Sequence, residues 1–263
     1  MLLSAALGAL VGIIMGLTGA GGGILAVPLL VFGLGLTVAQ AGPIGLLAVG
    51  AAATLGAGVG LINKIVRYRA AVLVAATGIL IAPLGVSLAH RLDTKILSVL
   101  FAVVLLWVAY KSFTDVTAER LSAEAVREPT CKRFTATGRF TWTIRCAAML
   151  TVTGGLAGLL SGMLGVGGGF VIVPALKRFT DLETRSVIAT SLTIISLVSL
   201  AGVAASWSAG QLDVALALPF SAGALAGMAA GSLISSQFPD KYLKIAFALI
   251  CLLVAVGMLA KAS

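Results

Sequence analysis

Two clusters of glycines are the strongest candidates for chemistry in this sequence. Gly19-Ala20-Gly21-Gly22-Gly23 lies inside one long apolar run, and Gly165-Val166-Gly167-Gly168-Gly169 lies inside another. Consecutive glycines favour a break in a helix. The first N–H groups of the next helix have no intrahelical partner and carry its positive dipole end, so they can bind an anion without a charged side chain. The predicted substrate-binding glycines are Gly21, Gly22, Gly23, Gly167, Gly168 and Gly169.

A stripe of hydroxyl groups in the second half of the chain is another candidate. Ser186, Thr190 and Thr193 share one face of a predicted helix, and Ser191 adjoins them. Hydroxyl groups can donate hydrogen bonds to an anion in a dry site. They can equally bond the carbonyl one turn earlier in their own helix, as Ser and Thr often do in membranes. Both interpretations stay open, and we include Thr190 and Ser191 in the predicted substrate site.

Side chains suited to acid–base or metal chemistry are missing from the apolar runs. No Asp, Glu, Lys, Arg or His lies inside any of them, and the single histidine, His90, stands at a segment end. This argues against a carboxylate-based proton pump and against general acid–base catalysis. We therefore expect no enzyme activity, no catalytic residue, no metal site and no cofactor. Because Cys131, Cys146 and Cys251 have no CxxC spacing, we expect small apolar residues with neither a disulfide nor a zinc site.

The composition places these candidates in a membrane rather than in a soluble core. Of 263 residues, 60% are hydrophobic and only 10% are charged, against roughly 25% charged in ordinary soluble domains. A bilayer accommodates that much apolar surface, and glycine suits close helix packing within it. The net charge of +9 comes from basic residues at the ends of apolar runs and in one central loop, where they can contact lipid headgroups. We expect a multi-pass membrane protein that contacts lipid and binds no nucleic acid.

The apolar runs form two copies of one four-segment unit. A shift of 146 residues aligns residues 8–28 with 154–174, and ten of those 21 positions are identical. This predicts an all-α integral membrane protein with membrane repeats at 1–113 and 146–263, joined by a polar cytoplasmic linker at 114–145. Glycines spaced four apart are expected to pack helices closely; they are Gly8, Gly12, Gly16, Gly154, Gly158 and Gly162.

The first segment of each repeat, residues 2–32 and 146–176, is too long for a single crossing. If each crosses once, 11 of the 18 Lys and Arg lie on one side of the membrane; if each turns back at its glycines, 15 do. The positive-inside rule favours the second arrangement, in which the two repeats are inverted. The N-terminus then lies outside and the linker in the cytoplasm. Because no Lys or Arg precedes the first apolar run, we expect no cleaved signal peptide.

The duplicated pattern GxGGG-x4-P, at Gly19–Pro28 and Gly165–Pro174, resembles the TauE/SafE family of membrane proteins. Ala189-Thr190-Ser191-Leu192 resembles that family's second-segment pattern, and the resemblance spans nearly the whole chain. It implies an exporter of sulfite, an organosulfonate or a related sulfur anion in the cytoplasmic membrane. Pro43-Ile44-Gly45 stands in the first half where the second half has Ala189-Thr190-Ser191, so hydroxyl groups would make the site asymmetric.

Two alternatives stay open at this point. One is a transporter of another small solute, because unwound backbone carbonyls can also bind cations. The other is a membrane scaffold without transport activity, in which the glycines serve helix packing and partner assembly. The sequence decides neither the identity of the small anionic substrate nor the coupling ion, and it leaves open whether copies of the chain form a homo-oligomer.

Overall fold

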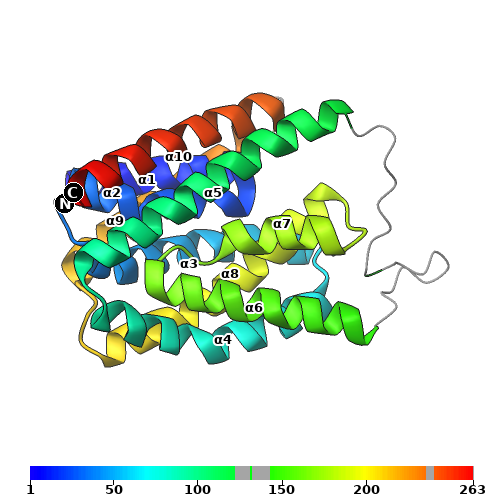
Figure 1. The fold of residues 1–263 in the computed structure, drawn as a ribbon, viewed down its shortest axis with the longest axis horizontal. Coiled ribbons are helices and arrows are strands. Elements are labelled where there is room, and N and C mark those ends of the chain that lie inside the picture. Colours follow the sequence, from blue (N-terminus) through cyan, green and yellow to red (C-terminus); the bar gives the residue numbers. More distant parts are fainter. Residues whose placement is uncertain (122–130, 132–142, 235–239, 263) are drawn as a thin grey trace.

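The chain folds into a bundle of helices lying side by side (Figure 1). The computed structural model describes residues 1–121, 131, 143–234 and 240–262. Most of the predicted linker 114–145 lies outside these residues. The elements are α1 (Leu2–Thr18), the 3-10 helix η1 (Gly19–Leu25), α2 (Ala26–Gly33), α3 (Val38–Ile62), α4 (Tyr68–Arg91), α5 (Thr94–Leu121), α6 (Ile144–Leu164), α7 (Gly169–Phe179), α8 (Thr184–Ser208), α9 (Val214–Ile234) and α10 (Asp240–Ala262).

The all-α membrane class is confirmed by the length and composition of these helices. Within the described residues, seven helices are long and apolar enough to cross a membrane: α3, α4, α5, α6, α8, α9 and α10. α3 and α8 pack against each other in the middle of the bundle, and α5 packs against α10. Apolar side chains face outward on most of the long helices, as Leu80 and Leu253 do with 76% and 73% exposure. Such side chains are placed to meet lipid rather than water.

Both overlong segments break at their glycines and turn back. In the first, a Cβ added to Gly33 at the end of α2 would lie 2.5 Å from Leu7 Cδ1, near the start of α1. In the second, the Cys131 N–H donates to the Phe179 carbonyl at the end of α7 (2.9 Å), and Cys131 is bonded to Cys146 in the first turn of α6. Each segment therefore ends near the place where it began, as the charge count predicted.

The cysteine prediction is wrong for one pair. Cys131 and Cys146 form a disulfide, with their Cα atoms 5.4 Å apart and both residues buried. Their proximity depends on the contact between Cys131 and the end of α7, where Cys131 also bridges to Thr180. Spacing along the chain does not reveal this contact. Cys251 is a free, buried thiol in α10.

Small residues let two pairs of helices pack with their backbones in contact. α1 packs against α9, and α6 packs against α4. A Cβ added to Gly16 would lie 2.7 Å from the Ser232 nitrogen, and one added to Gly162 would lie 2.9 Å from the Val86 nitrogen. Alanine at either position would push the helices apart. The predicted packing role of the four-residue glycine spacing is therefore confirmed.

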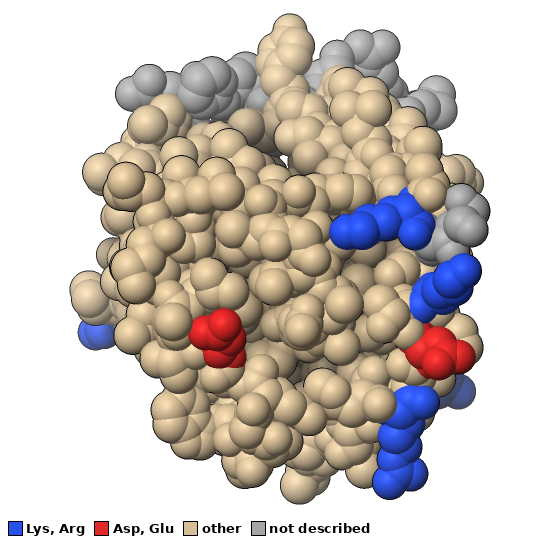
Figure 2. All heavy atoms as spheres, turned by 90° about the vertical axis from the view of Figure 1, so that its left-hand side faces the viewer, with Lys and Arg blue, Asp and Glu red and all other residues tan. Residues whose placement is uncertain are grey.

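The two ends of the bundle differ in charge. Both chain termini lie at one end, which we call the terminal end, and α5, α6, α7 and α8 meet at the other, the linker end (Figure 1). The terminal end shows few charged side chains on a mostly uncharged face (Figure 2). The helix ends and loops that lie at the linker end carry many basic residues, among them Lys64, Arg67, Arg69, Lys111, Arg145, Lys177, Arg178, Arg185 and Lys244.

Candidate functional site

The two glycine clusters break their helices in different ways. In the first half, α1 passes directly into η1, and within this break only Gly19 has a positive φ, of 77°. In the second half, Gly165, Gly167 and Gly168 have φ values of 72°, 74° and 70° before α7 begins. Residues with a Cβ rarely adopt this left-handed region, so the backbone of the second break requires glycine. The same sequence pattern thus has two conformations in one molecule.

The tips of the two breaks lie against each other, with side chains filling the space between them. A Cβ on Gly23 would lie 3.4 Å from the Val166 carbonyl oxygen. Val49 of α3 lies between the tips, because its Cγ1 is 2.9 Å from the Cβ positions of both Gly23 and Gly167. The two glycine breaks are in contact, but the space at their junction is occupied in this conformation.

Three more glycines of the predicted site, Gly22, Gly168 and Gly169, are packed against protein. A Cβ on Gly22 would lie 2.6 Å from the backbone of Met15, and one on Gly168 would lie 2.7 Å from the Ala157 carbonyl oxygen. Gly169 is also buried, at the first turn of α7. Substitution of Gly22 or Gly168 therefore tests folding before it tests binding, because the added Cβ meets backbone atoms that cannot move aside.

Two hydroxyl groups of the predicted stripe hold the loop before α4. Thr190 Oγ1 accepts a hydrogen bond from the Arg67 N–H (3.1 Å), and the Ser186 hydroxyl donates to the Ile65 carbonyl (2.7 Å). Thr193 donates to the carbonyl one turn earlier in its own helix (2.9 Å). In this conformation these three groups have structural partners.

Two buried hydroxyl groups on α8 have no such partner among the described residues. Ser191 and Ser199 are both 0% exposed, and their Oγ atoms make no hydrogen bond there. Ser199 Oγ lies 3.3 Å from the Cβ position of Gly167, so it faces the second break. Leaving a buried hydroxyl unpaired costs about 1–3 kcal/mol, which a bound ligand can offset. Ser199 joins the candidate residues through the structure, because nothing in the sequence connects it to Gly167.

A cavity of about 190 Å³ lies beside the first break, at the linker end. We call it the lysine pocket. Its apolar wall comprises Leu17, Trp107, Val108, Phe170, Val173, Pro174, Ile188, Leu243 and Phe247. Its polar side chains are Thr18, Lys111, Ser112, Lys177, Thr184 and Lys244. Of the eight predicted site residues, Gly21 lines this cavity, so the pocket reaches the first glycine break.

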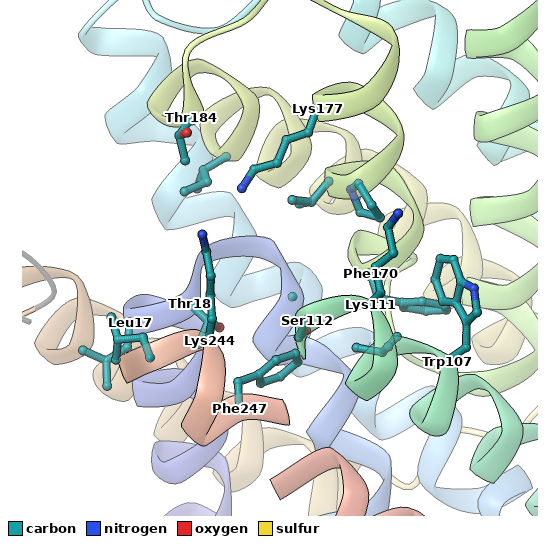
Figure 3. Close-up of a pocket in the computed structure, with 16 residues that line it drawn as sticks. Leu17, Thr18, Trp107, Lys111, Ser112, Phe170, Lys177, Thr184, Lys244 and Phe247 are labelled. Atoms are coloured by element: carbon teal, nitrogen blue, oxygen red, sulfur yellow. The ribbon is translucent and has the colours of Figure 1, made fainter. Parts of the chain in front are cut away.

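Three lysines from three helices converge on the lysine pocket (Figure 3). The side chains of Lys177 and Lys244 point towards each other across it, and Lys111 reaches it from α5 beside Trp107. None of the described residues that line the pocket is acidic. Like charges that line one cavity repel one another, and an anion between them relieves that repulsion. The pocket therefore has the electrostatic character of an anion site.

The hydroxyl groups of the pocket add hydrogen-bonding capacity. Thr18 already donates to the Ile14 carbonyl (2.7 Å), which leaves its oxygen only as an acceptor. The Ser112 and Thr184 side chains line the same cavity. Their hydroxyl groups can donate to an anion held by the lysines.

The sequence analysis did not predict the lysine pocket, although the positions of its three lysines at segment ends could be read from the sequence. Lys111, Lys177 and Lys244 stand at the ends of three apolar segments, where positive-inside bias alone explains lysines. The fold assigns all three to the same end, but only packing brings them around one cavity.

Comparison with known proteins agrees with the membrane architecture. The sequence profile described as "Sulfite exporter TauE/SafE" matches residues 4–258. The chain is 30% identical over 258 residues to a "Probable membrane transporter protein" of Xylella fastidiosa (strain 9a5c), covering 95% of this chain and 91% of that protein. It is 31% identical over 256 residues, with the same coverage, to a protein of the same description from strain Temecula1. No solved structure matches the chain.

Proposed function

The chain belongs to the TauE/SafE family of membrane transporters, and on that premise we propose that it exports a small sulfur-containing anion, sulfite or an organosulfonate, across the cytoplasmic membrane. The lysine pocket is the entrance on the cytoplasmic side. The observation that carries the proposal is that Lys111, Lys177 and Lys244 all line one cavity, where the described lining includes no acidic residue. The names of the relatives support transport, and the pocket's charge supports an anion.

The proposal includes an inverted-repeat organisation. α3, α4 and α5 begin at residues 38, 68 and 94, and α8, α9 and α10 begin at 184, 214 and 240, so each pair differs by the 146 residues of the sequence repeat. Packing between the halves follows the same repeat. α1 corresponds to α6 and α9 to α4, and α1 packs on α9 just as α6 packs on α4. The first half begins at the terminal end and the second at the linker end (Figure 1). These features support two copies of one unit inserted in opposite directions.

The direction of transport follows from orientation. Basic residues gather at the linker end, while the terminal end carries few charges (Figure 2). The positive-inside rule therefore places the linker end and the lysine pocket in the cytoplasm. An inside-negative potential drives an anion outward by about 2.3 kcal/mol per charge per 100 mV, so export needs no nucleotide hydrolysis.

The proposed path leads from the lysines to the glycine breaks. The lysines attract the anion and replace part of its hydration shell, and Ser112 and Thr184 supply neutral donors. Gly21 borders the pocket, so its neighbouring backbone is the first of the glycine tips that an anion meets. The deeper predicted residues, with Ser199 beside Gly167, form the next site once Val49 moves aside.

Efflux from proteoliposomes tests the proposal. Vesicles are loaded with labelled sulfite or a labelled short alkanesulfonate, and efflux is followed under an imposed inside-negative potential. We expect efflux faster than from protein-free vesicles and a rate that rises with the potential. Rates equal to protein-free vesicles for both anions, from protein that elutes as a single folded species in detergent, would contradict anion transport and favour the scaffold or another solute.

A further inference from the structure

The two glycine breaks differ in a way that the sequence does not require. Gly21 and Gly22 correspond to Gly167 and Gly168 under the 146-residue shift. The second pair has φ values of 74° and 70°, whereas the first pair lies outside the positive-φ region. A Cβ on Gly21 would meet only the Phe247 ring, at 3.8 Å, which is ordinary van der Waals contact. Alanine therefore fits at position 21 in this conformation, and the glycine there is unexplained by this structure alone.

Several repeat counterparts of the residues that line the lysine pocket are packed in the core. The same shift relates Thr184 to Val38, Leu243 to Leu97 and Lys177 to Val31. Thr184 and Lys177 are exposed and Leu243 is half-buried, whereas Val38, Leu97 and Val31 are 1%, 0% and 3% exposed. In these three pairs, one position borders an open cavity at the linker end and its counterpart is buried in a packed core.

We propose that the chain has a second anion site, the exit site, lined by the repeat counterparts of the lysine pocket, which opens towards the terminal end when the two glycine breaks exchange conformations. This inference rests on the inverted-repeat organisation proposed above. Its lining includes Ile24, Val31, Val38, Leu97, Phe101 and Gly167. The present structure is the state open to the cytoplasm.

The exit site takes the same class of small anion but holds it less tightly. Lys111, Lys177 and Lys244 correspond to Gly257, Val31 and Ser98, none of which is charged. Lys261, nearby, donates to the Val31 carbonyl (3.3 Å) and lies 5.9 Å from the centroid of the Phe32 ring. The anion therefore passes from a site with three lysines to one without their equivalents, which favours capture inside and release outside.

The exchange also explains the glycine at position 21. When the breaks exchange conformations, Gly21 adopts the positive φ that Gly167 has now. A side chain disfavours that region, so G21A leaves the present state intact and penalises the outward-open one. We expect G21A to lower the outward-open population about tenfold. G58A is the matched control, because a Cβ on Gly58 meets nothing within 4 Å and its counterpart, Ala204, already lies inside α8.

Cysteine accessibility from outside tests the exit site. V38C is treated in intact cells with a membrane-impermeant charged maleimide, and the labelling rate is measured by mass shift. We expect V38C to react from outside although Val38 is 1% exposed here, and V31C to behave alike should V38C insert poorly. A41C is the control at similar depth, because Ala41 and its counterpart Val187 are both 0% exposed, so it stays unreactive.

Combining V38C with G21A tests whether the opening depends on the exchange of the glycine breaks. The labelling rate of V38C is expected to fall about tenfold with G21A and to stay unchanged with G58A. V38C and V31C that never react, from protein that transports anions, would overturn the exit site. Equal labelling rates with and without G21A would overturn the exchange of the glycine breaks.

This test is separate from the test of the proposed function. Labelling of V38C reports the opening itself and needs no substrate. Labelled V38C without flux of either sulfur anion would retain the exit site and remove the proposed substrate. Flux of a sulfur anion without labelling of V38C would retain the proposed substrate and remove the exit site.

Discussion

Neutralising the lysine pocket tests how an anion is captured. Lys111, Lys177 and Lys244 line a cavity of about 190 Å³. We take a separation of about 4 Å between an anion and each ammonium group that it contacts. Lys177 is exposed and the other two are half-buried, so a water-like dielectric constant applies and each lysine contributes about 1 kcal/mol. That energy corresponds to a change of roughly fivefold in affinity.

The expected result is a graded rise in KM. K177Q is expected to raise the KM for efflux about fivefold, and K111Q/K177Q/K244Q to raise it on the order of 100-fold, with a smaller effect on the maximal rate. Because exposed charges are screened by salt, the difference between wild type and K177Q shrinks as ionic strength rises. The measurement is initial efflux of labelled anion from proteoliposomes over a range of internal concentrations.

A neighbouring basic residue provides the control. Arg178 is exposed on α7 directly after Lys177 and does not line the pocket. R178Q removes the same charge from the same helix, so its KM should stay within about twofold of the wild-type value. Equal effects of R178Q and K177Q would show that only the general surface potential matters, and an unchanged KM in the triple variant would refute capture by these lysines.

Three further expectations follow from the breaks, the buried hydroxyl and the disulfide. G168A is expected to lower the free energy of unfolding by roughly 2 kcal/mol, measured by thermal unfolding in detergent, because φ is +70° and the new Cβ would lie 2.7 Å from the Ala157 carbonyl oxygen. A melting curve like that of wild type would contradict the described break. S199A is expected to raise the KM for efflux several-fold without loss of thermal stability, because it removes an unpaired buried hydroxyl; an unchanged KM would exclude Ser199 from the path. The Cys131–Cys146 disulfide of this structure is expected to be reduced to two thiols in growing cells, because the proposed orientation puts both residues in the cytoplasm, where disulfides are rare. Alkylation of intact cells with a permeant maleimide before lysis counts these thiols, and a pair oxidised in cells would put the linker end outside and reverse the direction of transport.

The sequence predicted the elements of the fold well because their signals are local. Apolar length, the 146-residue repeat and the glycine clusters each act within a single segment or between matched segments. The distribution of charge predicted that both overlong segments turn back. The contacts of Gly33 and Phe179 at the ends of these segments agree with that prediction. The packing glycines, such as Gly16 and Gly162, were likewise readable from their spacing.

The sequence did not predict features that form only when distant segments pack together. Lys111, Lys177 and Lys244 come from three helices, and their convergence depends on how α5, α7 and α10 pack. The Cys131–Cys146 disulfide depends on a contact with the end of α7. For the predicted glycine site, the sequence failed in a different respect. The two glycine breaks are in contact, but a repeated sequence pattern does not predict that the two copies adopt different backbone conformations.

The most direct test of the central claim is to block the lysine pocket chemically. K177C is reconstituted in vesicles of known orientation, treated at the linker-end face with an impermeant negatively charged maleimide, washed, and assayed for potential-driven efflux of labelled anion. The account predicts that efflux falls to the protein-free rate, that a high concentration of alkanesulfonate slows the labelling, and that labelled R178C still transports. Fully labelled K177C that transports at its unlabelled rate would show that the anion does not pass through this pocket.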